Sequence, residues 1–181
     1  MDIYKVNWTR LQAEIFRALC IKAGNSMNLR GLAGIVKKTP TAILNVLPKL
    51  KAEGIIIIEK SRKMNLLSIE LNRDNPKTIC FKRIENLKMV YESGIIDYLK
   101  EKFQGSTIII FGSYSKGEDT TESDIDIAVI GSKEKAIDLA MFDKIFERKV
   151  TINFYKSFKE IHKHLLDNIL NGILLNGGVE L

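Results

Sequence analysis

The spacing of apolar residues over the first 72 positions predicts three helices followed by a two-stranded hairpin. Apolar residues recur at helical spacing in two segments, residues 8–23 and residues 28–38. Thr39 and Pro40 predict the start of a third helix, because threonine caps helices and proline fits their first turn. Two extended apolar runs then follow, at 55–58 and 66–71, and the basic residues between them predict a charged hairpin turn.

The pattern beyond this hairpin changes from helical to alternating. Residues 73–77 form a polar break, and a long helical pattern follows, interrupted at Ser93 and Gly94. Its apolar residues fall roughly on one stripe: Phe81, Ile84, Leu87, Tyr91 and Tyr98. From residue 107 strands alternate with helices, which predicts helices packed on a small sheet. The predicted strands lie at 107–111, 124–130, 149–155 and 172–175, and the predicted helices at 133–147 and 158–170.

Three segments follow from these patterns. We expect a first domain at residues 1–75, a connecting helix at residues 76–105 and a second domain at residues 106–181. The second domain is predicted to be α/β, with a mixed sheet flanked by helices, which makes the whole chain α+β. The first domain, with three short helices and then a two-stranded wing, resembles the winged-helix family.

The resemblance to winged-helix domains implies duplex DNA as a partner of the first domain. The formal net charge of the chain is +6, and residues 1–75 hold the whole excess, with 13 Lys/Arg against six Asp/Glu. In that family the third helix enters the major groove and the wing contacts the backbone. The candidate contacts are Lys37, Lys38, Thr41, Asn45 and Lys49 on the third helix, and Lys60, Arg62 and Lys63 on the wing.

The kind of contact that these residues favour is electrostatic. The third helix carries no arginine suited to reading bases, so we expect a salt-sensitive contact with phosphates rather than sequence-specific readout. Two alternatives stay open. The basic residues can form a solvated surface with no ligand, or the domain can serve only to pack against a neighbour or to form a homodimer.

The overall composition is typical of a soluble globular protein, with 45% hydrophobic and 28% charged residues. No apolar run approaches the roughly 20 residues that cross a bilayer, and the first residues lack the apolar core of a signal peptide. We therefore expect a cytoplasmic protein with no membrane partner. The chain has only two cysteines, Cys20 and Cys80, and they are far apart in the sequence. We therefore expect neither a disulfide framework nor a zinc site.

The segment GSYSKGEDTTESDID, from Gly112 to Asp126, concentrates glycine, serine and aspartate between the first two strands of the second domain. Asp124 and Asp126 are two residues apart in an extended run, so their carboxylates share one face of the strand about 7 Å apart. Such a pair repels unless a cation intervenes, and Mg²⁺ prefers oxygen ligands. Gly112 allows the backbone to approach a phosphate closely at the start of a helix, where Ser113 adds a donor. Lys116 supplies positive charge.

This segment matches the pattern G-S-x3-G-x5-S-D-x-D, and in this it resembles the DNA polymerase beta-like nucleotidyltransferase superfamily. Within that superfamily the chain is most similar to the minimal nucleotidyltransferases of prokaryotes, whose compact domain has about the size of residues 106–177. The resemblance implies that Mg²⁺ is the cofactor and that a nucleoside triphosphate such as ATP is the substrate. A nucleoside monophosphate would pass to an acceptor, and pyrophosphate would leave. The implied catalytic metal ligands are Asp124 and Asp126, and the implied nucleotide contacts are Gly112, Ser113, Lys116 and Ser123.

One acid that the resemblance implies is missing. Members of the superfamily carry a third carboxylate on the next strand, and counting back from the apolar run at 172–177 places Asn153 at its position. Thr151 is the alternative if the register moves by two residues. Neither side chain can act as a general base, although the Asn153 oxygen could still coordinate a metal weakly, so we expect reduced activity. Asp143 and Glu147, on the preceding predicted helix, are candidates to replace the missing acid.

Three functions fit these observations. The first is a metal-dependent nucleotidyltransferase with an unknown acceptor, in which the winged helix positions the acceptor or a partner. The second is a DNA-binding transcriptional regulator whose degenerate nucleotidyltransferase domain senses a nucleotide. The third is the antitoxin-like role of some minimal nucleotidyltransferases, which requires a partner protein.

Overall fold

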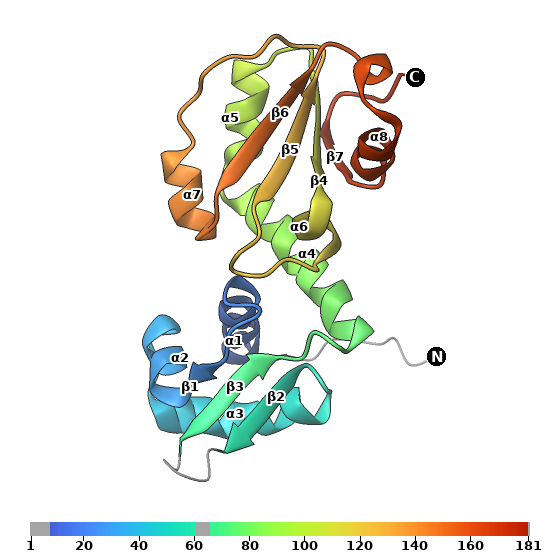
Figure 1. The fold of residues 1–181 in the computed structure, drawn as a ribbon. Helices are drawn as coiled ribbons and strands as arrows, with labels where there is room; N and C mark the ends of the chain where they lie inside the picture. The colour runs from blue at the N-terminus through green and yellow to red at the C-terminus, as the bar shows by residue number, and fades with distance from the viewer. Residues whose placement is uncertain (1–7, 61–65, 181) are drawn as a thin grey trace, which may run out of the picture. The chain divides into compact units, whose positions relative to one another are not determined.

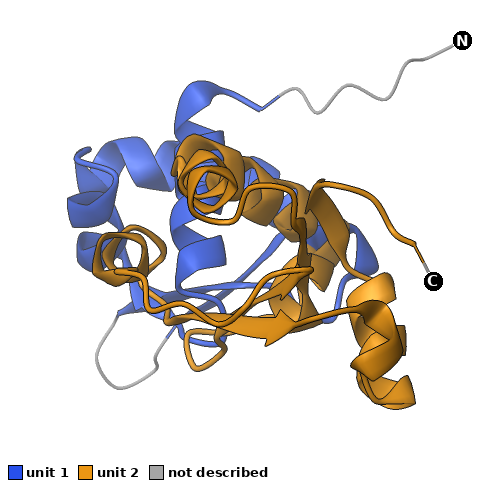
Figure 2. Cartoon of the chain, turned by 90° about the horizontal axis from the view of Figure 1, so that it is seen from above, with its two compact units in different colours: residues 1–78 blue, residues 79–181 orange. Residues whose placement is uncertain are grey.

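The computed structural model of the chain describes residues 8–60 and 66–180, and it divides into two compact units (Figure 1). Unit 1 comprises residues 1–78 and unit 2 comprises residues 79–181, as coloured in Figure 2. Each unit contains a sheet of its own, with three strands in unit 1 and four in unit 2 over the described residues. None of the helices found in these two ranges is long and apolar enough to cross a membrane.

Unit 1 has the element order of a winged helix. Its described elements are α1 (Arg10–Ile21), β1 (Met27–Asn28), α2 (Leu29–Ile35), α3 (Pro40–Ala52), β2 (Ile56–Lys60) and β3 (Leu67–Leu71). The sheet has the order β1-β3-β2 and is antiparallel throughout. The predicted winged helix is therefore confirmed, with one addition. The strand β1, which the sequence did not predict, pairs Met27 with Ile69 and Asn28 with Ser68.

Capping side chains begin the first and third helices, and the third follows Thr39 as the sequence predicts. Thr9 and Gln12 form a reciprocal capping box at the start of α1. Before α3, the Ala42 N–H donates to Thr39 Oγ1 at 3.2 Å. The apolar faces of the three helices and of β3 then meet in one core, whose fully buried members include Ile15, Leu19, Leu32, Ile43, Leu47, Leu50 and Ile69. Local capping signals and tertiary burial thus specify the same helix positions.

Unit 2 is built around a mixed sheet with the order β6-β5-β4-β7. Its described elements, with the helix that crosses the boundary between the units, are α4 (Pro76–Glu92), α5 (Ile95–Lys102), β4 (Thr107–Phe111), α6 (Gly112–Lys116), β5 (Ile125–Ile130), α7 (Ala140–Phe146), β6 (Val150–Tyr155), the 3-10 helix η1 (Phe158–Glu160), α8 (Lys163–Leu170) and β7 (Ile173–Asn176). Strands β5 and β6 are parallel, whereas β4 is antiparallel to both β5 and β7. The predicted α/β architecture with a mixed sheet is confirmed.

Helices cover both faces of this sheet (Figure 1). On one face, the rings of Phe103, which follows α5, and Phe154 of β6 pack edge to face with centroids 5.3 Å apart. On the other face, residues of β4 and β5 pack against the C-terminal helices in a buried cluster of Ile109, Phe111, Ala128, Ile130, Phe158, Ile161 and Ile169. The strands are consequently apolar along most of their length, and polar residues are concentrated at their ends.

Three predicted helices differ from the structure. The helix expected at 133–147 begins only at Ala140, because residues 133–139 are largely exposed and bury no apolar face that could stabilise a helix. The helix expected at 158–170 is divided into η1 and α8. In α4 the apolar stripe does not face the core: Ile84 is 63% exposed and Tyr91 is 60% exposed, whereas Lys82 and Asn86 are buried.

Gly117, which ends α6, allows a close contact between α4 and α6. Its φ is +79°, and a Cβ atom at this position would lie 2.6 Å from the Ile79 carbonyl oxygen and 2.7 Å from the Arg83 nitrogen. Glycine is therefore required both for the left-handed backbone and for the packing of α4.

We expect Gly117→Ala to destabilise the protein far more than Gly131→Ala. Gly131 has a similar positive φ of +92° but nothing within 4 Å of the added atom, so its substitution costs only the left-handed strain of about 1–2 kcal/mol. At Gly117 overpacking adds about 1–3 kcal/mol. Denaturant unfolding of the two variants measures the difference, and equal losses would contradict the packing role of Gly117.

Candidate active site

The glycine and aspartate residues of the motif meet at one end of the unit 2 sheet. Strand β4 ends at Phe111, and Gly112 immediately begins α6. Because β4 and β5 are antiparallel with Phe111 opposite Asp126, the start of β5 returns to the point where β4 ends. Gly112 and Asp126, which are 14 positions apart in the sequence, therefore lie side by side.

Gly112 is in direct contact with the Asp126 carboxylate. Its φ is +74°, and a Cβ atom built on it would lie 2.8 Å from Asp126 Oδ2. Real Cβ atoms essentially never come this close to another atom, so a larger residue here would displace the carboxylate. Gly112 therefore lets the Asp126 carboxylate lie close to the backbone, and the expected approach of a phosphate to Gly112 stays a prediction.

The two aspartates make this end of the sheet strongly acidic. Asp124 is exposed and Asp126 is half-buried. Burial raises the pKa of Asp126 above its ordinary value, and the negative charge of Asp124 raises it further. The pKa of Tyr155, on β6, is also raised, first by burial and then by the charge of Asp126. Uncompensated negative charge at this position favours the binding of a cation.

The register of β6 decides which residue lies beside Asp126. In the parallel pair of β5 and β6, Thr151 is opposite Asp126 and Asn153 is opposite Ala128. Asn153 was expected at the strand position beside Asp126, but the alternative residue, Thr151, occupies that position. Asn153 lies about 7 Å further along the strand. The Thr151 Oγ1 atom is buried and has no hydrogen-bond partner within the described part of the chain.

The two acids considered as replacements do not join the aspartates. Asp143 Oδ1 accepts a hydrogen bond of 2.8 Å from the Val150 N–H and so holds the start of β6. Within residues 8–60 and 66–180, no three His, Cys, Asp or Glu side chains are grouped so that they could hold a metal ion. Neither Asp143 nor Glu147 consequently forms a third acidic ligand beside Asp124 and Asp126.

The predicted nucleotide contacts lie around this acidic end of the sheet. Ser113 is half-buried in α6, a helix of only five residues with little dipole of its own, so phosphate contacts there depend on individual donors. Lys116 Nζ donates to Asn168 Oδ1 of α8 at 3.4 Å. Ser123 Oγ accepts a hydrogen bond of 3.0 Å from the Thr120 N–H, which closes the turn just before Asp124. A contact of these residues with a nucleotide stays a prediction.

A fully buried carboxylate, Asp119, organises the loop between α6 and β5. Its exposed fraction is 0%, and that of Lys82 on α4 is also 0%. Lys82 Nζ donates to Asp119 Oδ1, which also accepts from Asn86 Nδ2 at 2.7 Å. Arg148 donates to Asp119 Oδ2 from Nη2 at 3.1 Å and from Nε at 3.3 Å. Two buried cations and an amide thus neutralise and hold one loop carboxylate.

The predicted DNA contacts of unit 1 lie in different places. Lys37 and Lys38 were expected on the third helix, but they follow α2 and precede α3. Of the predicted contacts, Thr41, Asn45 and Lys49 are exposed on α3, and Lys60 is exposed at the end of β2. Arg62 and Lys63 lie outside the described residues. Binding of duplex DNA by unit 1 stays a prediction.

Comparison with known proteins identifies the family of unit 2. The family model described as a nucleotidyltransferase domain matches residues 92–175. A Methanocaldococcus jannaschii protein that is provisionally named a protein adenylyltransferase is 31% identical in an alignment of 84 residues, which covers 36% of this chain and 84% of that protein. This chain belongs to the nucleotidyltransferase domain family. The matched region includes the glycine turn, both aspartates and Thr151.

Two further similarities are more limited than these. A second M. jannaschii protein with the same provisional name is 58% identical over 31 residues, which cover 17% of this chain and 31% of that protein. A solved structure, that of a mutant of Lactococcus lactis ZitR, matches with a TM-score of 0.42 and 17% identity, covering 58% of this chain and 68% of that one. A TM-score at this level supports no conclusion about the fold.

The Asp119 network of this nucleotidyltransferase domain could not be found by searching for apolar faces. Lys82 and Asn86 are four residues apart and therefore share a face of α4, but they are polar, and the apolar residues of the same helix are exposed. The available signal was indirect. Asp119 lies in the motif loop, and Lys82 and Asn86 are four residues apart on α4. Only the fold shows that these residues contact one another.

We expect Asp119→Asn to lower the free energy of unfolding by about 3–5 kcal/mol, because it leaves the buried charges of Lys82 and Arg148 without their anion. Asp97→Asn, in the exposed first turn of α5, is the matched control and should cost less than about 1 kcal/mol. Denaturant unfolding monitored by circular dichroism compares the two. Similar small losses in both variants would show that the network does not stabilise unit 2.

Proposed function

We propose that the chain transfers an adenylyl group from ATP to a hydroxyl group of a protein. The observation that carries this proposal is the contact of Gly112 with the Asp126 carboxylate, beside Asp124, at one end of the sheet. The family supports nucleotidyl transfer, and the provisional names of the two M. jannaschii relatives support ATP as donor and a protein as acceptor. The hydroxyl oxygen would bond to the α-phosphorus, the bond from that phosphorus to the bridging oxygen would break, and pyrophosphate and a proton would be released.

The donor set of the site fits a magnesium ion. Asp124 and Asp126 offer carboxylate oxygens, and Mg²⁺ is commonly held by one or two carboxylates together with substrate phosphates. Burial and then the negative charge of Asp124 raise the pKa of Asp126, and a divalent cation held by these carboxylates would relieve their repulsion. When bound, Mg²⁺ would neutralise charge on the phosphates of ATP. Asp124 and Asp126 would hold the ion.

The remaining residues would bind and orient the nucleotide. Gly112, which has no side chain, lets a phosphate approach the backbone near Asp126, and Ser113 would donate from its hydroxyl. Lys116, held near α8 by Asn168, would add positive charge at the edge of the site. The Asp119 network would keep Asp124 in place, because it fixes the loop that ends at this residue. Positioning of this kind accounts for much of the rate in phosphoryl-transfer enzymes.

Thr151 would limit the rate of this reaction. It occupies the strand position opposite Asp126, where a third carboxylate could accept the proton of the attacking hydroxyl. A threonine hydroxyl is too weak a base for this purpose. Binding of ATP would therefore be retained while transfer is slow.

We expect Asp124→Asn and Asp126→Asn each to reduce transfer at least about 100-fold, because each removes a charged ligand of the site. The assay incubates the full chain with Mg²⁺, candidate protein acceptors and ATP labelled on either the α- or the γ-phosphate. Label should enter protein only from the α-phosphate. Asp97→Asn serves as the control, and γ-label in the product or unchanged rates in both site variants would exclude adenylyl transfer by this site.

Thr151→Asp should increase the transfer rate at least about tenfold, since a well-placed general base typically contributes 10²–10⁴. Asn153→Asp introduces the same charge one pleat repeat further along β6, opposite Ala128, and should leave the rate nearly unchanged. The measurement is the single-turnover rate with ATP labelled on the α-phosphate. Activation by Asn153→Asp and not by Thr151→Asp would refute the role given to Thr151.

A further inference from the structure

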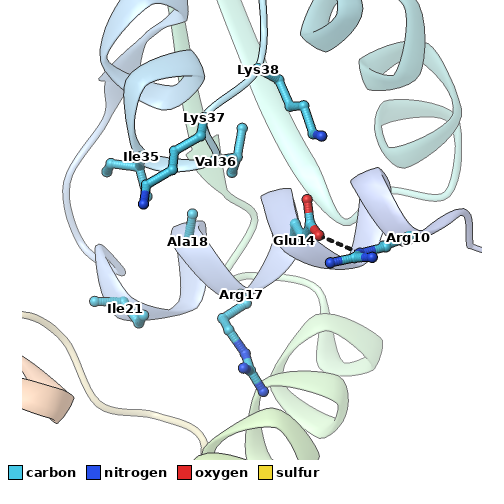
Figure 3. Close-up of a pocket in the computed structure, with 9 residues that line it drawn as sticks. All are labelled: Arg10, Glu14, Arg17, Ala18, Ile21, Ile35, Val36, Lys37 and Lys38. Atoms are coloured by element: carbon cyan, nitrogen blue, oxygen red, sulfur yellow. Dashed lines mark hydrogen bonds and ion pairs between the residues drawn. The ribbon is translucent and has the colours of Figure 1, made fainter.

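Unit 1 contains a cavity that is separate from the site described above. Its volume is about 390 Å³, and it lies between α1 and the turn that follows α2 (Figure 3). The apolar part of its wall is formed by Ala18 and Ile21 of α1 and by Ile35 and Val36 at the end of α2. Ile35 is 45% exposed, which is high for isoleucine. Cavities of roughly 300–1,000 Å³ with a mainly apolar wall are typical of small-molecule sites.

The rim of this cavity is cationic. Lys37 and Lys38 contribute their side chains to it, whereas the side chain of Arg17, another lining residue, extends from α1 away from α2 (Figure 3). Among the lining residues the one acid is Glu14, which is already paired with Arg10 through a contact of 2.8 Å between Glu14 Oε1 and Arg10 Nε. Lys37 and Lys38 therefore place positive charge beside the apolar wall. An apolar wall with a cationic rim is complementary to a molecule that has both an apolar body and an anionic group.

The backbone at Lys37 is strained. Lys37 has a φ of 53°, one of two positive values among non-glycine residues in the described part of the chain. It ends α2 in the position where helices usually place glycine, and the following Lys38 N–H donates back to the Ala33 carbonyl at 3.0 Å. A lysine in this conformation costs free energy that a glycine would not. Figure 3 shows its side chain extending from the end of α2 toward α1, over the cavity.

A strained residue whose side chain reaches a cavity indicates a function for that side chain. Nucleic acid would meet the cations with its phosphates, but its backbone would leave Ala18, Ile21, Ile35 and Val36 uncovered. An organic anion of small-molecule size would contact both the apolar wall and the lysines of the rim. We propose that this cavity binds a small organic anion, an aryl or acyl body bearing a sulfonate, carboxylate or phosphate group, whose charge contacts Lys37 and Lys38. Binding there is independent of nucleotidyl transfer in unit 2.

The test uses the full chain and 8-anilinonaphthalene-1-sulfonate, an anionic apolar fluorophore. Its uncharged counterpart, N-phenyl-1-naphthylamine, has the same ring system without the sulfonate and reports apolar contact alone. We expect saturable binding of the sulfonate probe and at least about tenfold weaker binding of the neutral probe, because a charge-assisted contact is lost.

Lys37→Gly separates ligand binding from structural support. It should weaken binding of the sulfonate probe about tenfold, and it should raise the melting temperature by about 4 °C because it relieves the left-handed strain. Lys37→Arg keeps the charge and should bind the probe as the wild type does. Lys51→Met, on α3 outside the cavity, should change neither affinity nor melting temperature.

Three results would overturn the proposal. The first is equal affinity of the wild type and Lys37→Gly for the sulfonate probe. The second is an equal effect of Lys37→Gly on the neutral probe, which would show that the charge is not recognised. The third is displacement of the sulfonate probe by a short DNA duplex whose own binding is weakened equally by Lys37→Gly, because the cavity would then belong to a nucleic-acid surface.

Discussion

The fold of unit 2 depends on the neutralisation of one buried carboxylate. Asp119 has no exposed surface, and a carboxylate in such a place is stable only with charged or hydrogen-bonding partners. Its cations come from opposite directions in the chain, Lys82 from 37 residues before it and Arg148 from 29 residues after it. These two cations thereby attach the loop between α6 and β5 to α4 and to the residues that precede β6. Because this loop joins the glycine turn to Asp124, both halves of the candidate site are held by the same contact.

Local chemistry made much of this structure predictable. Thr9 and Thr39 begin α1 and α3 because their hydroxyl groups accept hydrogen bonds from the next turn, an effect that depends only on nearby residues. The motif from Gly112 to Asp126 was equally readable, since a turn between two antiparallel strands brings its ends together. Elements that depend on distant partners were less accessible. Strand β1 has only two residues and exists through its pairing with β3.

The register of β6 illustrates a limit of inference from patterns. A shift of one residue would turn every side chain of a strand to the opposite face, so the alternation of apolar and polar residues excludes it. A shift of two residues leaves every side chain on its face and changes only its neighbours. Asn153 and Thr151 are related by such a shift, and only the pairing of Asp126 with Thr151 distinguishes them. The burial of Lys82 was not predicted for another reason. Lysine side chains are almost never fully buried unless they are paired, and the partner of Lys82 is distant in the sequence.

The Asp119 network also constrains how sequences of this kind can diverge. The motif pattern treats position 119 as free, yet here a neutral residue at that position would remove the carboxylate that pairs with two buried cations. Substitutions at 119, 82 and 148 are therefore coupled, and a single change in this set passes through a destabilised intermediate. Related chains should carry either all three charges or none of them. Correlated substitution at positions 82, 119 and 148 would then indicate that α4 packs against this loop. This would hold even in related sequences that have lost the aspartates at positions 124 and 126.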